Sequence, residues 1–231
     1  SQVFVERTLY EEDEYGSVAV AGRRRESLTS PAVSLVGDNT LWGGTGPVGG
    51  GRYHLTFSPS FAWLEHGLAY RSVTLDARQY WGLTGGYVLA GRVLACRSDG
   101  RDAPDFQVGG FGTLRGFPLY GLAGTRALVV NAELRFPFVE RLGVVGPVPL
   151  GGLALRGALF ADGGLVWDRG VPLRFTRVVD GERRLDSPRL AFGAGVRTTA
   201  LSLVLKLDAA WRTDLATVGR PRWEFSIGPE F

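Results

Sequence analysis

The chain has 231 residues, 45% of them hydrophobic, and a formal net charge of +3. The sequence has no run of about 18 apolar residues, which excludes a transmembrane helix. The small and evenly spread positive charge does not indicate a nucleic-acid-binding surface. The single cysteine, Cys96, excludes an internal disulfide.

Glycine and aromatic residues are abundant, with 34 glycines and 11% aromatic residues. So much glycine disfavours helices, whereas many short strands joined by turns and flanked by interfacial aromatic residues accommodate it. The composition therefore predicts an all-β protein.

Apolar and polar residues alternate with a period of two along most of the chain, as in a strand with two different faces. Between residues 201 and 211, leucines, an alanine and a tryptophan alternate with mostly polar residues over the length that a tilted strand needs to cross a bilayer. The pattern predicts about eleven strands, over residues 2–11, 15–24, 30–38, 51–59, 69–80, 85–97, 125–137, 153–167, 188–200, 201–212 and 221–231.

The polar members of this alternation carry charge near the middle of the predicted strands. A soluble sandwich opposes few charges on its buried side, whereas a membrane barrel surrounds a wet interior with them. The pattern therefore favours an antiparallel transmembrane β-barrel with apolar residues facing lipid, and the alternative is a large soluble β-sandwich or a lipocalin-like barrel. The inward charged residues are Arg92, Glu133, Arg135, Arg156, Asp162, Arg197, Lys206 and Asp208.

Two connections are long, at residues 98–124 and 168–188. Long loops of outer-membrane barrels lie on the extracellular side and short turns on the periplasmic side. We therefore expect both long connections at one end of the barrel.

Four separated motifs occur in an order that identifies a family. They are Gly109-Gly110-Phe111-Gly112-Thr113-Leu114-Arg115-Gly116-Phe117, Asn131-Ala132-Glu133-Leu134-Arg135-Phe136-Pro137, Phe160-Ala161-Asp162-Gly163-Gly164 and Phe225-Ser226-Ile227-Gly228-Pro229-Glu230-Phe231. Over roughly residues 30–231, the sequence resembles the C-terminal barrel of the BamA/TamA superfamily, the bacterial surface antigen barrels.

The resemblance implies a loop, residues 98–124, that folds into the lumen and carries the signature Leu114-Arg115-Gly116-Phe117. In the family pattern, Arg115 meets the acidic residue Asp162, with Phe160 beside it and Glu133 as a second acidic partner. A carboxylate in bidentate geometry would offset part of the cost of burying the guanidinium. An alternative is that this cluster is only a scaffold, with no contact to a substrate.

The resemblance also implies that the last strand is an assembly signal read by the outer-membrane assembly machinery. Its residues would be Trp223, Phe225, Ile227, Gly228 and Phe231. The alternative is an ordinary lipid-facing strand that ends in the interfacial aromatic belt.

The sequence departs from the family in length, because family barrels usually have sixteen strands. We therefore expect the chain to be a single barrel domain over residues 1–231, with further strands or periplasmic modules upstream. Gly228 in the last strand is expected to weaken side-chain packing there.

The sequence is compatible with three functions. The first is insertion, assembly or translocation of proteins at the outer membrane of a Gram-negative bacterium, the second a structural anchor or subunit for a periplasmic domain or larger complex, and the third a passive pore. Expected partners are outer-membrane lipid and lipopolysaccharide, the assembly machinery, and periplasmic domains or partner subunits, but no nucleic acid.

The sequence does not indicate an enzyme, a cofactor or a metal site. It has two histidines, and His54 and Ser58 are too far apart along one strand for a direct hydrogen bond. The acidic run Glu11 to Glu14 is expected to be a solvated turn, with loose Ca²⁺ binding as the alternative.

Overall fold

The computed structural model of the protein describes residues 2–6, 9–11, 25–27, 30–62, 67–142, 153–200 and 203–228. It is an all-β structure, as the sequence predicted, and its one helical segment in these residues is the short 3-10 turn η1 (Thr84–Gly86). In the part of the chain that the structure describes, no helix has the length and apolar composition that crossing a bilayer requires.

One antiparallel sheet contains most of the strands, and strands that follow one another in the chain are neighbours in the sheet. Strands β4 (Ser30–Asp38) and β12 (Leu153–Trp167) have the predicted bounds. The sheet order is β1 (Gln2–Glu6), β4, β6 (Gly46–Ser60), β7 (Tyr70–Gly82), β8 (Val88–Gly100), β11 (Arg126–Leu142), β12, β15 (Arg189–Ala200), β16 (Leu203–Thr213) and β17 (Arg222–Ile227), with β5 (Leu41–Gly43) paired to β6.

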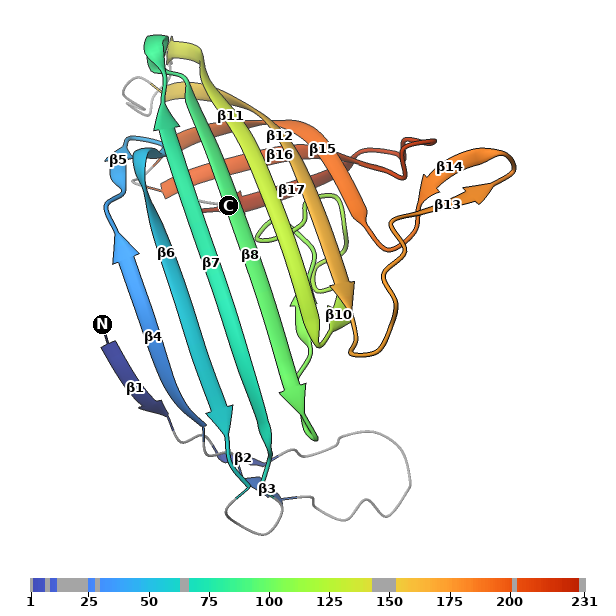
Figure 1. The fold of residues 1–231 in the computed structure, drawn as a ribbon. Helices are drawn as coiled ribbons and strands as arrows, with labels where there is room; N and C mark the ends of the chain where they lie inside the picture. The colour runs from blue at the N-terminus through green and yellow to red at the C-terminus, as the bar shows by residue number, and fades with distance from the viewer. Residues whose placement is uncertain are drawn as a thin grey trace.

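The sheet is strongly curled (Figure 1), so that β15, β16 and β17 pass behind β7 and β8. Within the described residues, β1 and β17 form the two edges and are not paired with each other. The architecture is thus an antiparallel partial barrel. The predicted strand over residues 15–24 and most of the acidic run, residues 12–14, lie outside the described residues; β2 (Leu9–Glu11) pairs with β3 (Arg25–Ser27).

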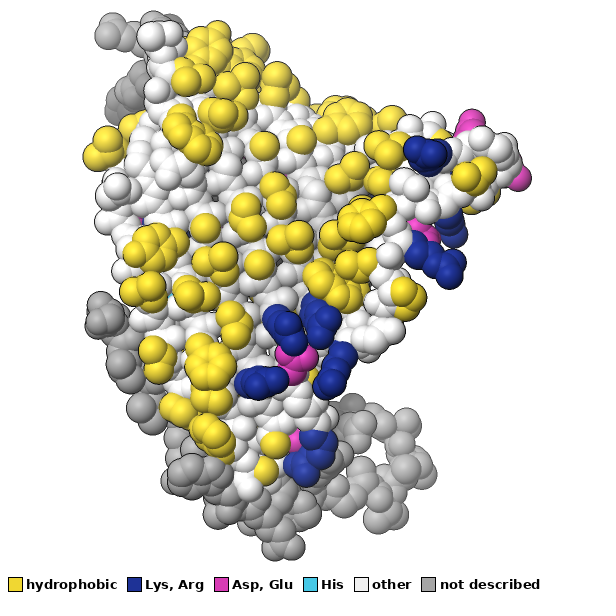
Figure 2. Space-filling model, in the orientation of Figure 1, with side chains coloured by type: hydrophobic (Ala, Val, Ile, Leu, Met, Phe, Trp, Pro, Cys, Tyr) yellow, Lys and Arg dark blue, Asp and Glu magenta, His cyan; other side chains and the backbone are white. Residues whose placement is uncertain are grey.

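The two faces of the sheet differ as the alternation predicted. Apolar side chains are exposed on the outer face, for example Phe57, Val130 and Leu207, and Figure 2 shows them spread over it. The charged side chains that alternate with them point inward and are buried, including Arg92, Glu133, Arg135, Asp162, Arg197, Lys206 and Asp208. This arrangement is the reverse of a soluble protein with a dry core.

Both long connections leave the same end of the sheet, as the sequence analysis predicted. Arg126, the first residue of β11, lies opposite Trp167, the last residue of β12. The backbone N–H of Thr125 donates to Asp168 Oδ1 at 3.0 Å, which joins the two connections. We call this the long-loop end and the opposite one the short-turn end.

The long connections contain strands that the sequence pattern did not predict. Residues 101–125, the lumen loop from here on, include the paired strands β9 (Phe106–Val108) and β10 (Leu122–Gly124). The second connection contains the hairpin of β13 (Thr176–Val179) and β14 (Glu182–Leu185), which projects away from the sheet (Figure 1). The lumen loop lies on the inner side of the curled sheet.

At the short-turn end, the turn between β5 and β6 and the first residues of β6 contact strands across the interior. The Thr199 hydroxyl of β15 donates to the Gly44 carbonyl oxygen at 2.6 Å. Arg135 of β11 donates to the Pro47 carbonyl oxygen at 3.3 Å. This turn therefore reaches across the interior.

Candidate functional site

The tip of the lumen loop is a compact turn that depends on glycine. Gly109, Gly110 and Gly116 have φ angles of 131°, 81° and 83°, a region that side chains disfavour. The Gly110 N–H is within hydrogen-bonding distance of the carbonyl oxygens of Leu114 and Phe117, both at 3.1 Å. The loop thereby presents Arg115 at a fixed position.

Leu114 and Phe117, on either side of the arginine and Gly116, fix the loop by apolar packing. Both are buried in a cluster whose other members come from β8, β9, β11 and β15. Gly164 of β12 leaves room for Leu114, because a Cβ at this position would lie 2.9 Å from Leu114 Cδ2. The buried members of the cluster are Cys96, Val108, Leu114, Phe117, Ala127, Val129 and Ala191.

Arg115 is buried and bound by two carboxylates. Its Nε and Nη2 atoms donate to Asp162 at 2.7 and 2.9 Å, and its Nη1 atom donates to Glu133 at 2.5 Å. Its backbone N–H also donates to Asp162, at 3.2 Å. The relative exposure of Arg115 is 4%, and that of Asp162 and of Glu133 is 2%. The structure thus brings together the arginine and the two acidic residues that the resemblance implied.

The arginine remains charged in this environment. It lies in the connection between β8 and β11, where burial on its own lowers the pKa of the guanidinium. The hydrogen bonds to Asp162, together with the charges of Asp162, Glu133 and Asp208, outweigh burial and raise this pKa above its usual range. Ion pairs between charged groups therefore hold the lumen loop in place.

The ring of Phe160 packs against the guanidinium group of Arg115. The guanidinium carbon lies 3.6 Å from the centre of the Phe160 ring, in the geometry of a cation–π contact. The ring has room because Gly193 faces it from β15: a Cβ at Gly193 would overlap the ring of Phe160 and the carbonyl oxygen of Ala209. Gly193 is therefore a packing requirement of the site.

Replacing Gly193 by Ala is expected to destabilise the folded barrel by about 1–3 kcal/mol, because the added methyl group overpacks this position. Gly112→Ala is the matched control, since a Cβ there meets no atom within 4 Å. The measurement is the unfolding midpoint of each variant in detergent micelles. Equal midpoints for both variants would contradict the proposed packing role.

Two further ion pairs surround Glu133. Arg197 of β15 donates to Glu133 at 3.1 Å and to Asp208 of β16 at 2.5 Å. Arg135 donates to the other oxygen of Glu133 at 2.8 Å. The three arginines and the carboxylates of Glu133, Asp162 and Asp208 form one network across β11, β12, β15 and β16, which links the lumen loop to four strands.

The loop also contacts the last strand. The Gly116 N–H donates to Glu224 Oε1 of β17 at 2.9 Å, while Arg212 of β16 lies over the Phe117 ring at 5.6 Å. Glu224 is buried at 9% relative exposure, and its Oε2 atom has no hydrogen-bond partner in the described structure. One side chain of the edge strand thus binds the tip of the lumen loop directly.

On the other side of the loop, β8 and β11 hold two of its carbonyl groups. Arg92 donates to the Gly112 oxygen at 2.6 Å, and Asn131 donates to the Thr113 oxygen at 2.8 Å. Asp76 binds Arg92 and Arg78 together, each at 2.9 Å. The lumen loop is therefore braced on both sides of its arginine.

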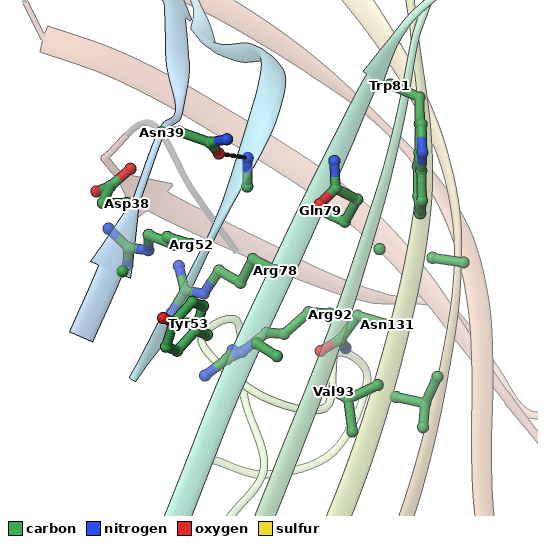
Figure 3. A pocket seen from close by; sticks show the side chains of 16 residues that line it. Asp38, Asn39, Arg52, Tyr53, Arg78, Gln79, Trp81, Arg92, Val93 and Asn131 are labelled. Carbon is green, nitrogen blue, oxygen red and sulfur yellow. Dashed lines mark hydrogen bonds between the residues drawn. The ribbon is translucent and has the colours of Figure 1, made fainter. Parts of the chain in front are cut away.

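Arg92 and Arg78 belong to a row of arginines that continues to Arg52, since the three residues lie in register on β8, β7 and β6. The three arginines help to line a cavity of about 810 Å³, whose lining also includes Asp38 and Asn131, and Figure 3 shows how their side chains lie. The inner surface beside the loop is thus basic.

The predicted assembly-signal residues lie mainly on β17. Trp223, Phe225 and Ile227 point outward and are exposed. Gly228 follows the strand with a φ of 133° and donates its N–H to the Val204 carbonyl oxygen at 2.8 Å, so it ends the strand. Phe231 lies outside the described residues.

Sequence reasoning did not assign Asn131, Arg197, Asp208 or Glu224 to the site. Their inward parity was readable from the alternation, and Asn131 also begins one of the four motifs, but neither signal identifies the partners of these side chains. Their partners depend on strand register and on the path of the lumen loop, which places Gly116 beside a residue 108 positions away.

An antiparallel curled sheet with an apolar outer surface and a charged interior that holds an inserted loop defines the class of transmembrane β-barrels. Within this class, the model of the Omp85 superfamily domain matches residues 37–231. The chain therefore belongs to the Omp85 superfamily, outer-membrane proteins that work in assembly and translocation. The resemblance to the BamA/TamA barrels is consistent with this result. No curated protein matches the sequence significantly.

Proposed function

We propose that the chain inserts, assembles or translocates proteins at the outer membrane of a Gram-negative bacterium, in the manner of BamA and TamA. The observation that carries this proposal is the last strand, an edge strand whose inner side is bound by the lumen loop through Glu224. Superfamily membership supports the same general activity.

The edge strand β17 is short, and among the described strands of the sheet it pairs with one neighbour, β16. Strand β17 pairs with β16 over six residues, although β16 has eleven. Among the described residues, β17 has no second neighbour in the sheet. An edge strand offers backbone N–H and C=O groups to which an extended segment of another chain adds as a further strand.

The side chains of β17 suit such an addition. Trp223, Phe225 and Ile227 face outward, whereas Glu224 and Ser226 face inward. A strand of an outer-membrane protein precursor has the same alternation, apolar outward and polar inward. The incoming strand would thus continue both surfaces of the barrel without burying an unpaired charge.

We infer that the lumen loop with Arg115 maintains the curvature of the sheet beside β17 while a substrate strand pairs with this edge. We also infer that β17, with Gly228 and Phe231, is the signal by which the chain itself is assembled. The proposed activity is non-enzymatic, and it requires neither a cofactor nor a metal ion.

The test is photocrosslinking in cells with the complete protein. A crosslinking amino acid at Phe225 is expected to capture newly made outer-membrane β-barrel precursors. The matched control is Val73, which also faces outward but lies on β7 between two paired strands. Capture at Phe225 that stops when synthesis of new outer-membrane proteins stops would support the proposal, and equal capture at both positions would contradict it.

The two rival functions predict other outcomes. A structural anchor would give one fixed crosslinked partner that is independent of new synthesis. A passive pore would give steady conductance in planar bilayers that added precursor does not change. Either result would overturn the proposed assembly function.

A further inference from the structure

The outer face carries a cluster of arginines at the long-loop end. We call Arg71, Arg97, Arg101, Arg126 and Arg169 the rim arginine cluster. Figure 2 shows cationic side chains gathered around acidic ones at the lower end of the apolar surface. The Arg97 and Arg101 side chains are 60% and 70% exposed.

Strand register places this cluster where the apolar band ends. Phe57, Val73, Arg97 and Arg126 lie side by side on β6, β7, β8 and β11, and Arg71 is two residues beyond Val73 toward the long-loop end. These residues share the outward parity of the exposed apolar side chains. Trp167 of β12 lies opposite Arg126, as expected of the aromatic belt at a membrane interface. Arg71, Arg97 and Arg126 therefore lie at the depth expected for lipid headgroups.

The cluster has more positive than negative charge. Asp99 accepts hydrogen bonds from Arg97 at 2.5 Å and from Arg126 at 3.5 Å, and Asp102 pairs with Arg101 at 3.0 Å. The third nearby carboxylate, Asp168, accepts from Thr125. Among the residues that the structure describes, five arginines thus face three carboxylates.

Two of these arginines are available for a ligand. Arg71 and Arg169 are exposed, and their side chains have no ion pair with any residue that the structure describes. Both line one groove, of about 580 Å³. Asp99 also lines the groove, but its carboxylate accepts hydrogen bonds from Arg97 and Arg126. Among the described residues, the guanidinium groups of Arg71 and Arg169 are therefore without an ion-pair partner at a concave part of the outer surface.

The same groove has an apolar wall. Phe57, Pro59 and Phe61 line it together with Arg71, Arg101 and Arg169. Cationic and apolar surfaces side by side match a molecule with an anionic head and a hydrocarbon tail. Guanidinium groups bind phosphate in bidentate geometry, and basic pockets beside membrane-spanning elements bind anionic lipid headgroups.

We propose that this groove binds one anionic lipid with a phosphorylated headgroup from the leaflet at the long-loop end. Its phosphate lies between Arg71 and Arg169, and an acyl chain lies along Phe57 and Phe61. General snorkelling of interfacial arginines toward water would instead show no preference for phosphate. This proposal concerns a surface away from β17, so it does not depend on the proposed assembly function.

The test measures lipid binding to the full chain in detergent micelles by native mass spectrometry. The probes are lipid A with two phosphates and the same lipid after enzymatic dephosphorylation. The phosphorylated form is expected to bind at least about tenfold more tightly, since each tenfold step corresponds to about 1.4 kcal/mol. Equal binding of the two forms would overturn the proposal, as would binding of inorganic phosphate alone with the affinity of the lipid.

Two double variants distinguish lipid binding in this groove from non-specific attraction of an anionic lipid to positive surface charge. Arg71→Gln with Arg169→Gln is expected to reduce binding of phosphorylated lipid A at least about tenfold. The control, Arg183→Gln with Arg220→Gln, removes the same charge from exposed positions that do not line the groove, and it is expected to leave binding unchanged. Equal losses for both double variants would overturn the proposal.

Discussion

Replacing Arg115 by Ala is expected to lower the stability of the folded barrel by about 3–5 kcal/mol and to abolish the proposed assembly function. The substitution leaves the buried Asp162 without the cation that binds it, whereas Glu133 retains Arg135 and Arg197. A buried charge that loses its partner is strongly destabilising. The measurements are urea unfolding in micelles and the level of other outer-membrane proteins in cells that depend on the variant.

Three further variants test the cause of this loss. Arg115→Lys is expected to recover only part of the stability, because an ammonium group cannot form the paired contacts with Asp162. The double variant Arg115→Ala with Asp162→Ala is expected to lose less than the sum of the two single losses. Arg183→Ala, at an exposed position, is expected to be neutral. Additive losses would show that the ion pair does not act as a unit.

Replacing Glu224 by Ala is expected to increase hydrogen exchange of the β17 amides by about ten- to one-hundredfold. The Gly116 N–H loses its acceptor on the last strand, and a hydrogen bond to a charged group contributes about 1.5–3 kcal/mol. The edge strand would then separate from β16 more often. Exchange followed by mass spectrometry on the complete protein measures this change.

Two controls identify the contact responsible. Glu224→Gln keeps an oxygen that accepts the Gly116 N–H, and it is expected to retain most of the protection. Ser226→Ala alters the next inward residue of β17, whose side chain has no hydrogen bond to the lumen loop among the described residues. Similar exchange in all three variants would contradict a role for the Glu224 contact in holding the strand.

The strands and their faces could be predicted because alternation is a local property. The predicted bounds of β4 and β12 are those of the structure, and inward parity placed Glu133 and Asp162 on the charged side. The hairpin of β13 and β14 was missed because its exposed residues carry no apolar alternation.

The candidate site was predictable only in part. Arg115, Asp162, Glu133 and Phe160 were identified through the resemblance, and the structure places them in contact. The contact of Glu224 with Gly116 was out of reach, because it depends on how far the sheet curls and on where the loop tip lies inside it. Such long-range geometry leaves no periodic signal in the sequence.

The turn between β5 and β6 has a mechanical consequence. In the sheet, β6 and β15 are separated by β7, β8, β11 and β12, and neighbouring strands are about 4.8 Å apart. The hydrogen bond of Gly44 with Thr199 connects the two ends of that arc, and the hydrogen bond of Pro47 with Arg135 connects β6 with β11. Hydrogen bonds across the interior fix the curvature of the sheet. A strand could therefore join or leave the edge at β17 while the other strands keep their arrangement.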